Sequence, residues 1–218
     1  MTWVIIPAYN EQKYISNVIK DVKKYSKNII VVDDGSSDET FKIAKKSGVV
    51  ALKHVVNLGK GAALKTGCDY ALKHGAERLI AVDADGQHDP KDIPIFVKRL
   101  KNVDIVFGIR KLNKKMPIVL KFGNWFLSWV TKLLYNIDIK DTQCGYRAFT
   151  SKTYKKIRWR ASDYSMESEI IANVGKNGLK YDFVQIDTIY SDKYKGTTVA
   201  DGVRIAFNLL VWKLRRQK

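Results

Sequence analysis

Short apolar runs alternate with longer amphipathic stretches through the amino-terminal half of the chain. The apolar runs occupy residues 3–6, 29–32, 79–82 and 103–107, and each of them ends in polar or charged residues. Runs of this length that are rich in Val and Ile, with helical patterns between them, are typical of βαβ units. Parallel sheets built in this way are covered by helices on both faces. The pattern therefore predicts an α/β fold with a mostly parallel central sheet.

Two carboxylates, Asp83 and Asp85, follow the third apolar run directly. Carboxylate oxygens at this spacing suit Mg²⁺ or Mn²⁺, since such hard cations complete their shell with water and substrate phosphates. The position agrees with this chemistry, because open α/β sheets bind ligands at the carboxyl ends of their strands. Taken alone, the stretch is equally compatible with a simple turn, because Asp-Gly is a common turn pair and Asp89-Pro90 is typical of a helix start.

The other apolar runs also end in polar segments, at residues 7–11, 33–38 and 108–110. We expect these segments to meet the acidic pair at one edge of the sheet, because parallel strands share their carboxyl ends. Arg110 is suited to phosphate oxygens, which a guanidinium binds in a bidentate manner. A surface ion pair is the alternative for this arginine. The edge as a whole predicts a site that holds a cation together with an anionic ligand.

Six segments in this order resemble the motif series of inverting family 2 glycosyltransferases, and most closely the dolichyl-phosphate mannose and dolichyl-phosphate glucose synthase branch. The resemblance covers about residues 1–200 and implies a GT-A-type, Rossmann-like nucleotide-sugar-binding domain with helices on both faces of the sheet. The segments are Pro7-Ala8-Tyr9-Asn10-Glu11, residues 31–38, Leu58-Gly59-Lys60-Gly61, residues 83–87, residues 108–110 and Asp141-Thr142-Gln143-Cys144-Gly145-Tyr146-Arg147.

The resemblance also implies roles for residues on the donor side. It makes Asp83, Asp85 and Gln87 the ligands of Mg²⁺ or Mn²⁺, which stabilises the leaving diphosphate as a Lewis acid. It places further residues around the nucleotide and its diphosphate, with the backbone of Ala84 at the ribose-diphosphate. These are Pro7, Tyr9, Glu11, Val32, Asp34, Asp83, Ala84, Asp85, Gln87, Arg110 and Lys193.

Two residues near this pocket have structural alternatives. Tyr9 is also compatible with an aromatic ring packed at a strand end. Asp38 fits a helix N-cap better than a ligand contact, because Asp is among the preferred N-cap residues. Asp33 is compatible with orienting the turn rather than touching a ligand.

The acceptor decides whether the enzyme needs a base. A sugar hydroxyl loses a proton as it attacks, and Asp141 would be the base in that case. A lipid phosphate is already anionic and needs cations instead of a base. The resemblance places Lys121 at the acceptor phosphate. The alternative for Lys121 is a lysine that snorkels at the membrane interface. Glu167 and Glu169 match an acidic pair of the family, in which Glu169 holds the acceptor loop or a cation. The implied catalytic residues are Asp85, Arg110, Lys121 and Glu169.

The stretch 57–63 looks like a helix start whose free amide groups could receive an anion. It is not a Walker loop, because no Lys-Ser/Thr pair follows Gly61. A Gly-x-Gly-x-x-Gly fingerprint after the first strand is also missing, which argues against a dinucleotide oxidoreductase.

One segment departs from the family pattern. Family members close the site with a loop that reads approximately Arg-x-Arg-Gly-x-Ser-Lys, whereas here Lys193 and Lys195 replace the arginines and Val199 replaces the last lysine. Lysine keeps the charge but lacks the bidentate fork of arginine. The departure leaves the sugar donor open.

The formal net charge of +17 indicates a polyanionic partner. Nucleic acid is the generic candidate, but the chain carries no recognisable nucleic-acid-binding signature. Two predicted helices, at residues 116–136 and 203–216, favour an anionic membrane surface, because the first has a wide apolar face with Trp125 and Trp129. A helix buried in a core or a dimer interface is the alternative.

The sequence therefore predicts one glycosyltransferase domain over residues 1–218 that moves a hexose from a GDP- or UDP-sugar to a polyprenyl (dolichyl) phosphate with inversion. We expect peripheral attachment at the cytoplasmic membrane face, because no run of 18 apolar residues and no signal peptide is present. Cys68 and Cys144 form no disulfide framework, which suits a reducing compartment. Transfer to a glycan hydroxyl is one alternative, and a basic nucleic-acid-binding protein is the alternative from another class.

Overall fold

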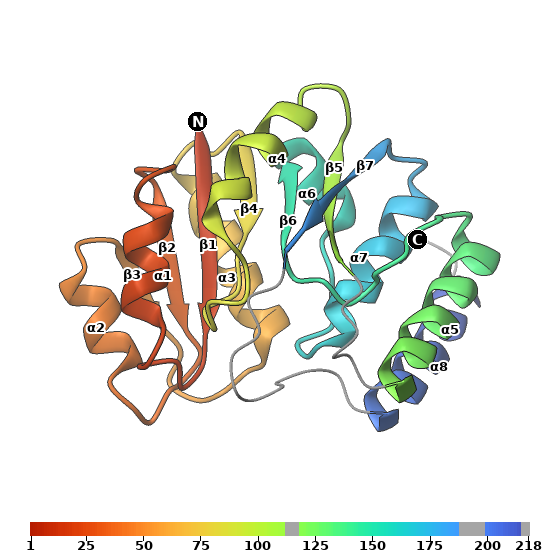
Figure 1. The fold of residues 1–218 in the computed structure, drawn as a ribbon, viewed down its shortest axis with the longest axis horizontal. Coiled ribbons are helices and arrows are strands. Elements are labelled where there is room, and N and C mark those ends of the chain that lie inside the picture. Colours follow the sequence, from red (N-terminus) through yellow and green to blue (C-terminus); the bar gives the residue numbers. More distant parts are fainter. Residues whose placement is uncertain (112–117, 188–198, 215–218) are drawn as a thin grey trace.

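The computed structural model describes residues 1–111, 118–187 and 199–214. A seven-stranded sheet forms its centre, with the strand order β3-β2-β1-β4-β6-β5-β7 (Figure 1). All neighbouring strands run parallel except β6, which is antiparallel to both β4 and β5. The strands are β1 (Thr2–Ala8), β2 (Ile29–Asp33), β3 (Val50–Lys53), β4 (Arg78–Ala81), β5 (Ile105–Arg110), β6 (Arg147–Thr150) and β7 (Tyr181–Ile186). The predicted α/β class with a mostly parallel sheet is confirmed.

Helices cover both faces of this sheet, as the sequence predicted. One apolar core lies between the sheet and α1, α2 and α4, and the other lies between the sheet and α3, α5, α6, α7 and α8. The helices are α1 (Ile15–Val22), α2 (Thr40–Lys46), α3 (Lys60–Lys73), the 3-10 turn η1 (Pro90–Asp92), α4 (Ile93–Arg99), α5 (Ile118–Tyr135), α6 (Ser151–Ile157), α7 (Ser165–Lys176) and α8 (Val199–Leu214).

The two cores explain why β1 is apolar at every position from Trp3 to Ala8. Successive side chains of a strand point to opposite faces, so a strand between two helix layers buries all of them. In β1, Ile5 belongs to one core, Val4 and Ile6 belong to the other, and all three are fully buried.

The antiparallel strand β6 places a distant motif beside the acidic pair. Its first residue, Arg147, is paired with Ala81, the last residue of β4. Residues 141–146 therefore reach the sheet at the same edge at which residues 82–87 leave it. The sequence patterns did not single out β6, because its four residues begin with Arg147 and end with Thr150 and so form no apolar run.

Helices α5 and α8 lie side by side at one end of the molecule (Figure 1). Leu127 and Val130 of α5 and Ile205 and Leu209 of α8 are buried in the core of that face. The Tyr135 hydroxyl donates a hydrogen bond to the Leu209 carbonyl oxygen at 2.7 Å and joins the two helices. In the described part of the chain, no helix combines the length and apolarity that a membrane crossing requires.

Helix α3 packs so closely on β1 that one glycine is required at the contact. A Cβ atom on Gly67 would lie 2.4 Å from Ile5 Cγ2 and 3.2 Å from Val32 Cγ2. We predict that Gly67→Ala lowers the free energy of unfolding by about 1–3 kcal/mol, the usual cost of overpacking a core. Gly123→Ala in α5 is the control, since no described atom lies within 4 Å of its added Cβ. There, the higher helix propensity of alanine should leave stability unchanged or raise it by up to about 1 kcal/mol. Urea unfolding curves measure both, and equal effects would contradict the packing argument.

Candidate active site

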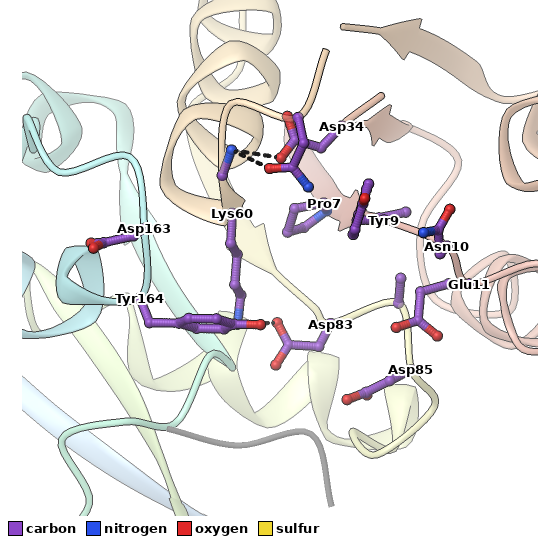
Figure 2. A pocket seen from close by; sticks show the side chains of 14 residues that line it. Pro7, Tyr9, Asn10, Glu11, Asp34, Lys60, Asp83, Asp85, Asp163 and Tyr164 are labelled. Carbon is purple, nitrogen blue, oxygen red and sulfur yellow. Dashed lines mark hydrogen bonds and ion pairs between the residues drawn. The ribbon is translucent and has the colours of Figure 1, made fainter. Parts of the chain in front are cut away.

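A cavity of about 580 Å³ lies at the carboxyl ends of β1, β2 and β4, where the sequence predicted a site (Figure 2). Its wall comes from the end of β1, from the segments that follow β1, β2 and β4, from the start of α3 and from the turn before α7. The lining residues are Pro7, Ala8, Tyr9, Asn10, Glu11, Asp34, Asn57, Gly59, Lys60, Asp83, Ala84, Asp85, Asp163 and Tyr164.

The two aspartates of the acidic pair have different proton affinities. Burial alone would raise the pKa of Asp83, but the nearby Lys60, His88 and Arg147 outweigh it and bring that pKa to about 2. Burial and the negative charge of Asp83 raise the pKa of Asp85 to about 6. The site thus holds one firmly ionised carboxylate and a second one whose ionised form is disfavoured by burial and by the first.

A divalent cation fits this arrangement. Bound between Asp83 and Asp85, it would compensate the charge that raises the pKa of Asp85. The described residues contain no cluster of three or more His, Cys, Asp or Glu side chains that could hold a metal by itself. Two carboxylates at an open cavity are nevertheless the donor set of a Mg²⁺ or Mn²⁺ ion that shares substrate phosphates. The Gln87 backbone N–H donates to Asp85 Oδ1 at 2.9 Å, so that Gln87 orients this carboxylate through its main chain.

Lys60, the first residue of α3, bridges two acidic residues. Its ammonium lies 2.8 Å from Asp83 Oδ1 and 3.1 Å from Glu167 Oε1. Burial alone would lower the pKa of Lys60, but the charges of these two carboxylates raise it above its ordinary value. The lysine therefore stays cationic at the wall of the cavity.

The expectation that amides at the start of α3 receive an anion is wrong. The Gly61 N–H donates to the Ser162 carbonyl oxygen at 2.7 Å, and the Gly59 N–H donates to Asp34 Oδ2 at 2.7 Å. Because these donors already have protein partners, the positive charge at this helix start comes from the Lys60 side chain.

The residues predicted for the nucleotide pocket separate into two groups. Pro7, Tyr9, Glu11, Asp34 and Ala84 line the cavity. Tyr9 is exposed, so the alternative of a packed aromatic ring is wrong. In contrast, Val32 is fully buried in the core and does not line the cavity.

Asp34 and Asp38 hold loops around the cavity. Asp34 accepts hydrogen bonds from the Leu58 and Gly59 amides and pairs with His54 Nδ1 at 2.7 Å. Asp38 accepts from the Thr40 amide at 2.9 Å and from the Gln12 amide at 3.1 Å. Asp38 therefore has a structural role, but the N-cap position of α2 is Glu39, so the predicted N-cap lies one residue away.

Arg110 and Asp141 form a bidentate ion pair outside the described lining of the cavity. Arg110 Nε and Nη2 donate to Asp141 Oδ2 and Oδ1 at 2.7 and 2.8 Å. The Arg110 backbone N–H donates to Oδ2 as well, at 3.2 Å. Both oxygens of the carboxylate that sequence reasoning offered as a base are thus engaged by one arginine.

Residues 141–147 also form the wall behind the acidic pair. A Cβ atom on Gly145 would lie 2.6 Å from both carboxylate oxygens of Asp83 and 2.8 Å from Lys60 Nζ. Only glycine leaves room at this position for the ion pair of Asp83 and Lys60. The buried Arg147 donates to the backbone oxygens of Cys144 and Glu167 and fixes this segment against the start of α7.

Glu169 holds the turn that sequence reasoning missed. Its carboxylate accepts hydrogen bonds from the Arg160 and Ala161 amides at 2.8–3.0 Å. Of the two roles that the sequence left open, the structure shows Glu169 holding a loop. This loop continues to Asp163 and Tyr164, which line the cavity.

The sequence does contain a signal for the loop at residues 160–164, namely the glycines at positions 59 and 61. Cβ atoms on Gly59 and Gly61 would lie 2.3 Å from the Ser162 oxygen and 2.4 Å from the Ala161 oxygen, so the paired glycines mark a close backbone approach. Two other predicted residues remain untested: the side chain of Lys121 and the whole of Lys193 lie outside the described residues.

Gly145 provides a test of the acidic site. We predict that Gly145→Ala displaces Asp83 or Lys60 and lowers divalent-cation and nucleotide binding at least tenfold, because interactions of this kind depend on sub-ångström placement. Titration calorimetry with Mn²⁺ and UDP measures binding, and thermal unfolding monitors the fold. Gly123→Ala serves as the matched control. Unchanged binding in Gly145→Ala would contradict the prediction, because it would show that the segment around Gly145 moves to accommodate a Cβ atom next to Asp83.

Comparison with known proteins places this geometry in a family. The model of the family "Glycosyl transferase family 2" matches residues 3–161. A Methanococcus voltae protein named UDP-N-acetylglucosamine–dolichyl-phosphate N-acetylglucosaminyltransferase is 37% identical over 98% of this chain and 96% of its own length. A dolichyl-phosphate beta-glucosyltransferase of Trichomonas vaginalis is 27% identical over 99% of this chain and 76% of its own length.

Solved structures agree on the fold. Glucosyl-3-phosphoglycerate synthase from Mycobacterium tuberculosis, in complex with Mn²⁺, UDP and phosphoglyceric acid, superposes with a TM-score of 0.78 at 18% identity and covers 100% of this chain and 80% of that one. At this identity the likeness shows the GT-A-type fold alone. Together with the family match and the relatives named for dolichyl-phosphate transfer, it identifies the chain as a glycosyltransferase that belongs to family 2.

Proposed function

We propose that this enzyme transfers one sugar unit from a nucleotide diphosphate sugar to a polyprenyl phosphate, in a single displacement that inverts the anomeric centre. The observation that carries the proposal is the open acidic pair of Asp83 and Asp85 at the strand-end cavity. A uridine donor is favoured over a guanosine donor, since the Methanococcus voltae relative is named for a UDP-sugar. The motif series and the family explain these residues, whereas a basic nucleic-acid-binding module would not require them.

On the donor side, the exposed ring of Tyr9 offers a face to the base, and Glu11 lines the same cavity. Asp34 shapes this pocket by holding the Leu58 and Gly59 amides. A Mg²⁺ or Mn²⁺ ion held by Asp83 and Asp85 would supply Lewis-acid stabilisation of the leaving diphosphate. Lys60 keeps Asp83 ionised and in place for this role, through its contact at 2.8 Å.

On the acceptor side, the pairing of Asp141 supports a phosphate over a hydroxyl. A general base needs an oxygen that can reach the proton of the attacking group. Both oxygens of Asp141 are bound by Arg110, while a polyprenyl phosphate arrives without a proton to remove. Arg110 provides the positive charge that such an acceptor requires.

The helix pair of α5 and α8 supports peripheral attachment to a membrane, at its cytoplasmic face, where the acceptor would lie. Trp125 and Trp129 on α5 are 59% and 51% exposed, and Phe207 on α8 is 65% exposed. Leu133 and Leu214 are exposed on the same two helices. Tryptophan and aliphatic side chains on a helix surface are suited to the lipid interface, and the positive net charge adds attraction to anionic lipids.

The reaction itself is tested with a donor panel. GDP- and UDP-sugars with Mg²⁺ or Mn²⁺ are assayed for label that enters a lipid extract containing polyprenyl phosphate. We predict transfer that EDTA abolishes and that Asp85→Ala lowers by at least about 10³-fold, because the leaving group loses its counter-charge. Asp21→Ala, at an exposed residue paired with Lys24, is the control and should keep full activity. Full activity in EDTA would refute metal dependence, and label that enters only soluble glycans would refute the lipid acceptor.

The membrane surface makes a separate prediction. The protein should sediment with anionic vesicles at low salt and be partly released at high salt, because salt screens the electrostatic part of the attraction. Trp125→Ser with Trp129→Ser should weaken this binding without lowering stability, since both side chains are about half exposed. Tyr25→Ser, at an exposed aromatic residue near the end of α1, is the matched control. Normal vesicle binding, or unfolding, of the double variant would assign the helix face to a core or an oligomer interface.

A further inference from the structure

We propose that Asp141 is a positioning residue, which holds the Arg110 guanidinium ready for the phosphate of the acceptor. The inference rests on the proposed function, because it takes a polyprenyl phosphate as the acceptor. It gives Asp141 a role other than that of a general base.

The Arg110 guanidinium is held in one orientation by Asp141. Three hydrogen bonds connect Arg110 to Asp141, two from the guanidinium and one from the backbone N–H. The Asp141 side chain is 5% exposed, whereas that of Arg110 is 23% exposed. The carboxylate therefore lies inside the protein, and the guanidinium forms the partly exposed side of the pair.

A guanidinium that is fixed in advance binds an anion better than a mobile one. Ordering a long side chain when the ligand arrives reduces affinity, and a preformed ion pair avoids this loss. The planar fork of arginine also fixes the direction of its N–H groups, so the orientation of the plane decides which oxygens it can meet. Asp141 sets this plane through the two parallel contacts at 2.7 and 2.8 Å.

The same segment connects the Arg110 guanidinium to the acidic pair. Asp141 holds Arg110 at the end of β5, and four residues later Gly145 lies against the carboxylate of Asp83. Arg147, two residues further on, begins β6 and pairs with the end of β4. A single short segment thus fixes both the acceptor-side cation and the residue that would hold the metal, so their separation is set by the fold.

A double-mutant cycle separates positioning from base catalysis. Wild type, Arg110→Ala, Asp141→Asn and the double variant are assayed for kcat and KM with polyprenyl phosphate. We expect Arg110→Ala to lower kcat/KM for the acceptor by about 10²–10³-fold, the usual loss for a cationic or oxyanion-type contact. Asp141→Asn should act in the same direction and raise the KM of the acceptor while leaving that of the donor unchanged. The double variant should be no worse than Arg110→Ala, because Asp141 acts only through Arg110.

A base would give a different cycle. If Asp141 removed a proton, Asp141→Asn would cost about a further 10²–10⁴-fold in the Arg110→Ala background. Such additive losses, or an unchanged acceptor KM in Asp141→Asn, would overturn the inference. Asp138→Asn is the matched control, because Asp138 is exposed, lies three residues away and pairs with Lys132. It should behave as wild type.

Folding and the proposed function are controlled separately. If Asp141→Asn does not fold, Asp141→Glu replaces it, since the longer carboxylate keeps the charge but shifts the guanidinium. A raised KM for the acceptor in Asp141→Glu then supports the inference. An unchanged KM for the acceptor overturns it. If wild type transfers no sugar to polyprenyl phosphate, the proposed function itself fails. If wild type transfers sugar and the cycle is additive, only the role of Asp141 fails.

Discussion

The contact of Lys60 with Asp83 and Glu167 is the interaction on which the site depends. It joins the start of α3, the segment after β4 and the start of α7, which are far apart in the sequence. A buried carboxylate that loses its cation is strongly destabilising. Removal of the ammonium would take the cation away from the buried Glu167 and weaken the positive charge around Asp83. The lysine therefore connects the stability of the fold to the ionisation of the residue that would hold the metal.

Three positions around this contact have no room for a side chain and are occupied by glycine. For the ammonium to reach Asp83, the chain at Gly145 must pass without a side chain, because a Cβ atom would lie 2.8 Å from Lys60 Nζ. For α3 to begin at Lys60, the turn before α7 must lie directly on Gly59 and Gly61. The Glu169 carboxylate then holds this turn by accepting hydrogen bonds from the amides of Arg160 and Ala161. This brings Tyr164 to the cavity. Residues that look like separate motifs in the sequence are thus parts of one packing arrangement.

The sequence was sufficient for the fold class and for the sheet edge at which the cavity lies, because both depend on local patterns. Buried strands show as apolar runs, and the polar residues that follow them reach one edge by the geometry of parallel sheets. What the sequence could not predict depends on contacts between distant segments. The turn with Asp163 and Tyr164 lines the cavity only because Glu169 and two glycines hold it there. The amide groups at the start of α3 were expected to be free for the same reason. In the structure, the Ser162 carbonyl oxygen and the Asp34 carboxylate accept hydrogen bonds from them.

Val32 and Asp141 lie in surroundings that differ from the roles their motifs suggest. A motif assigns Val32 to the pocket by its position between active-site residues, but alternation along β2 turns its side chain into the core. Asp141 is chemically capable of acting as a base, and only its hydrogen bonds to Arg110 give it another role. The antiparallel strand β6 creates that difference. Because it returns the chain to the end of β4, residues 141–147 lie between the carboxylates that would hold a metal and the end of β5. The guanidinium that we propose for the acceptor is therefore oriented by the protein itself, through Asp141.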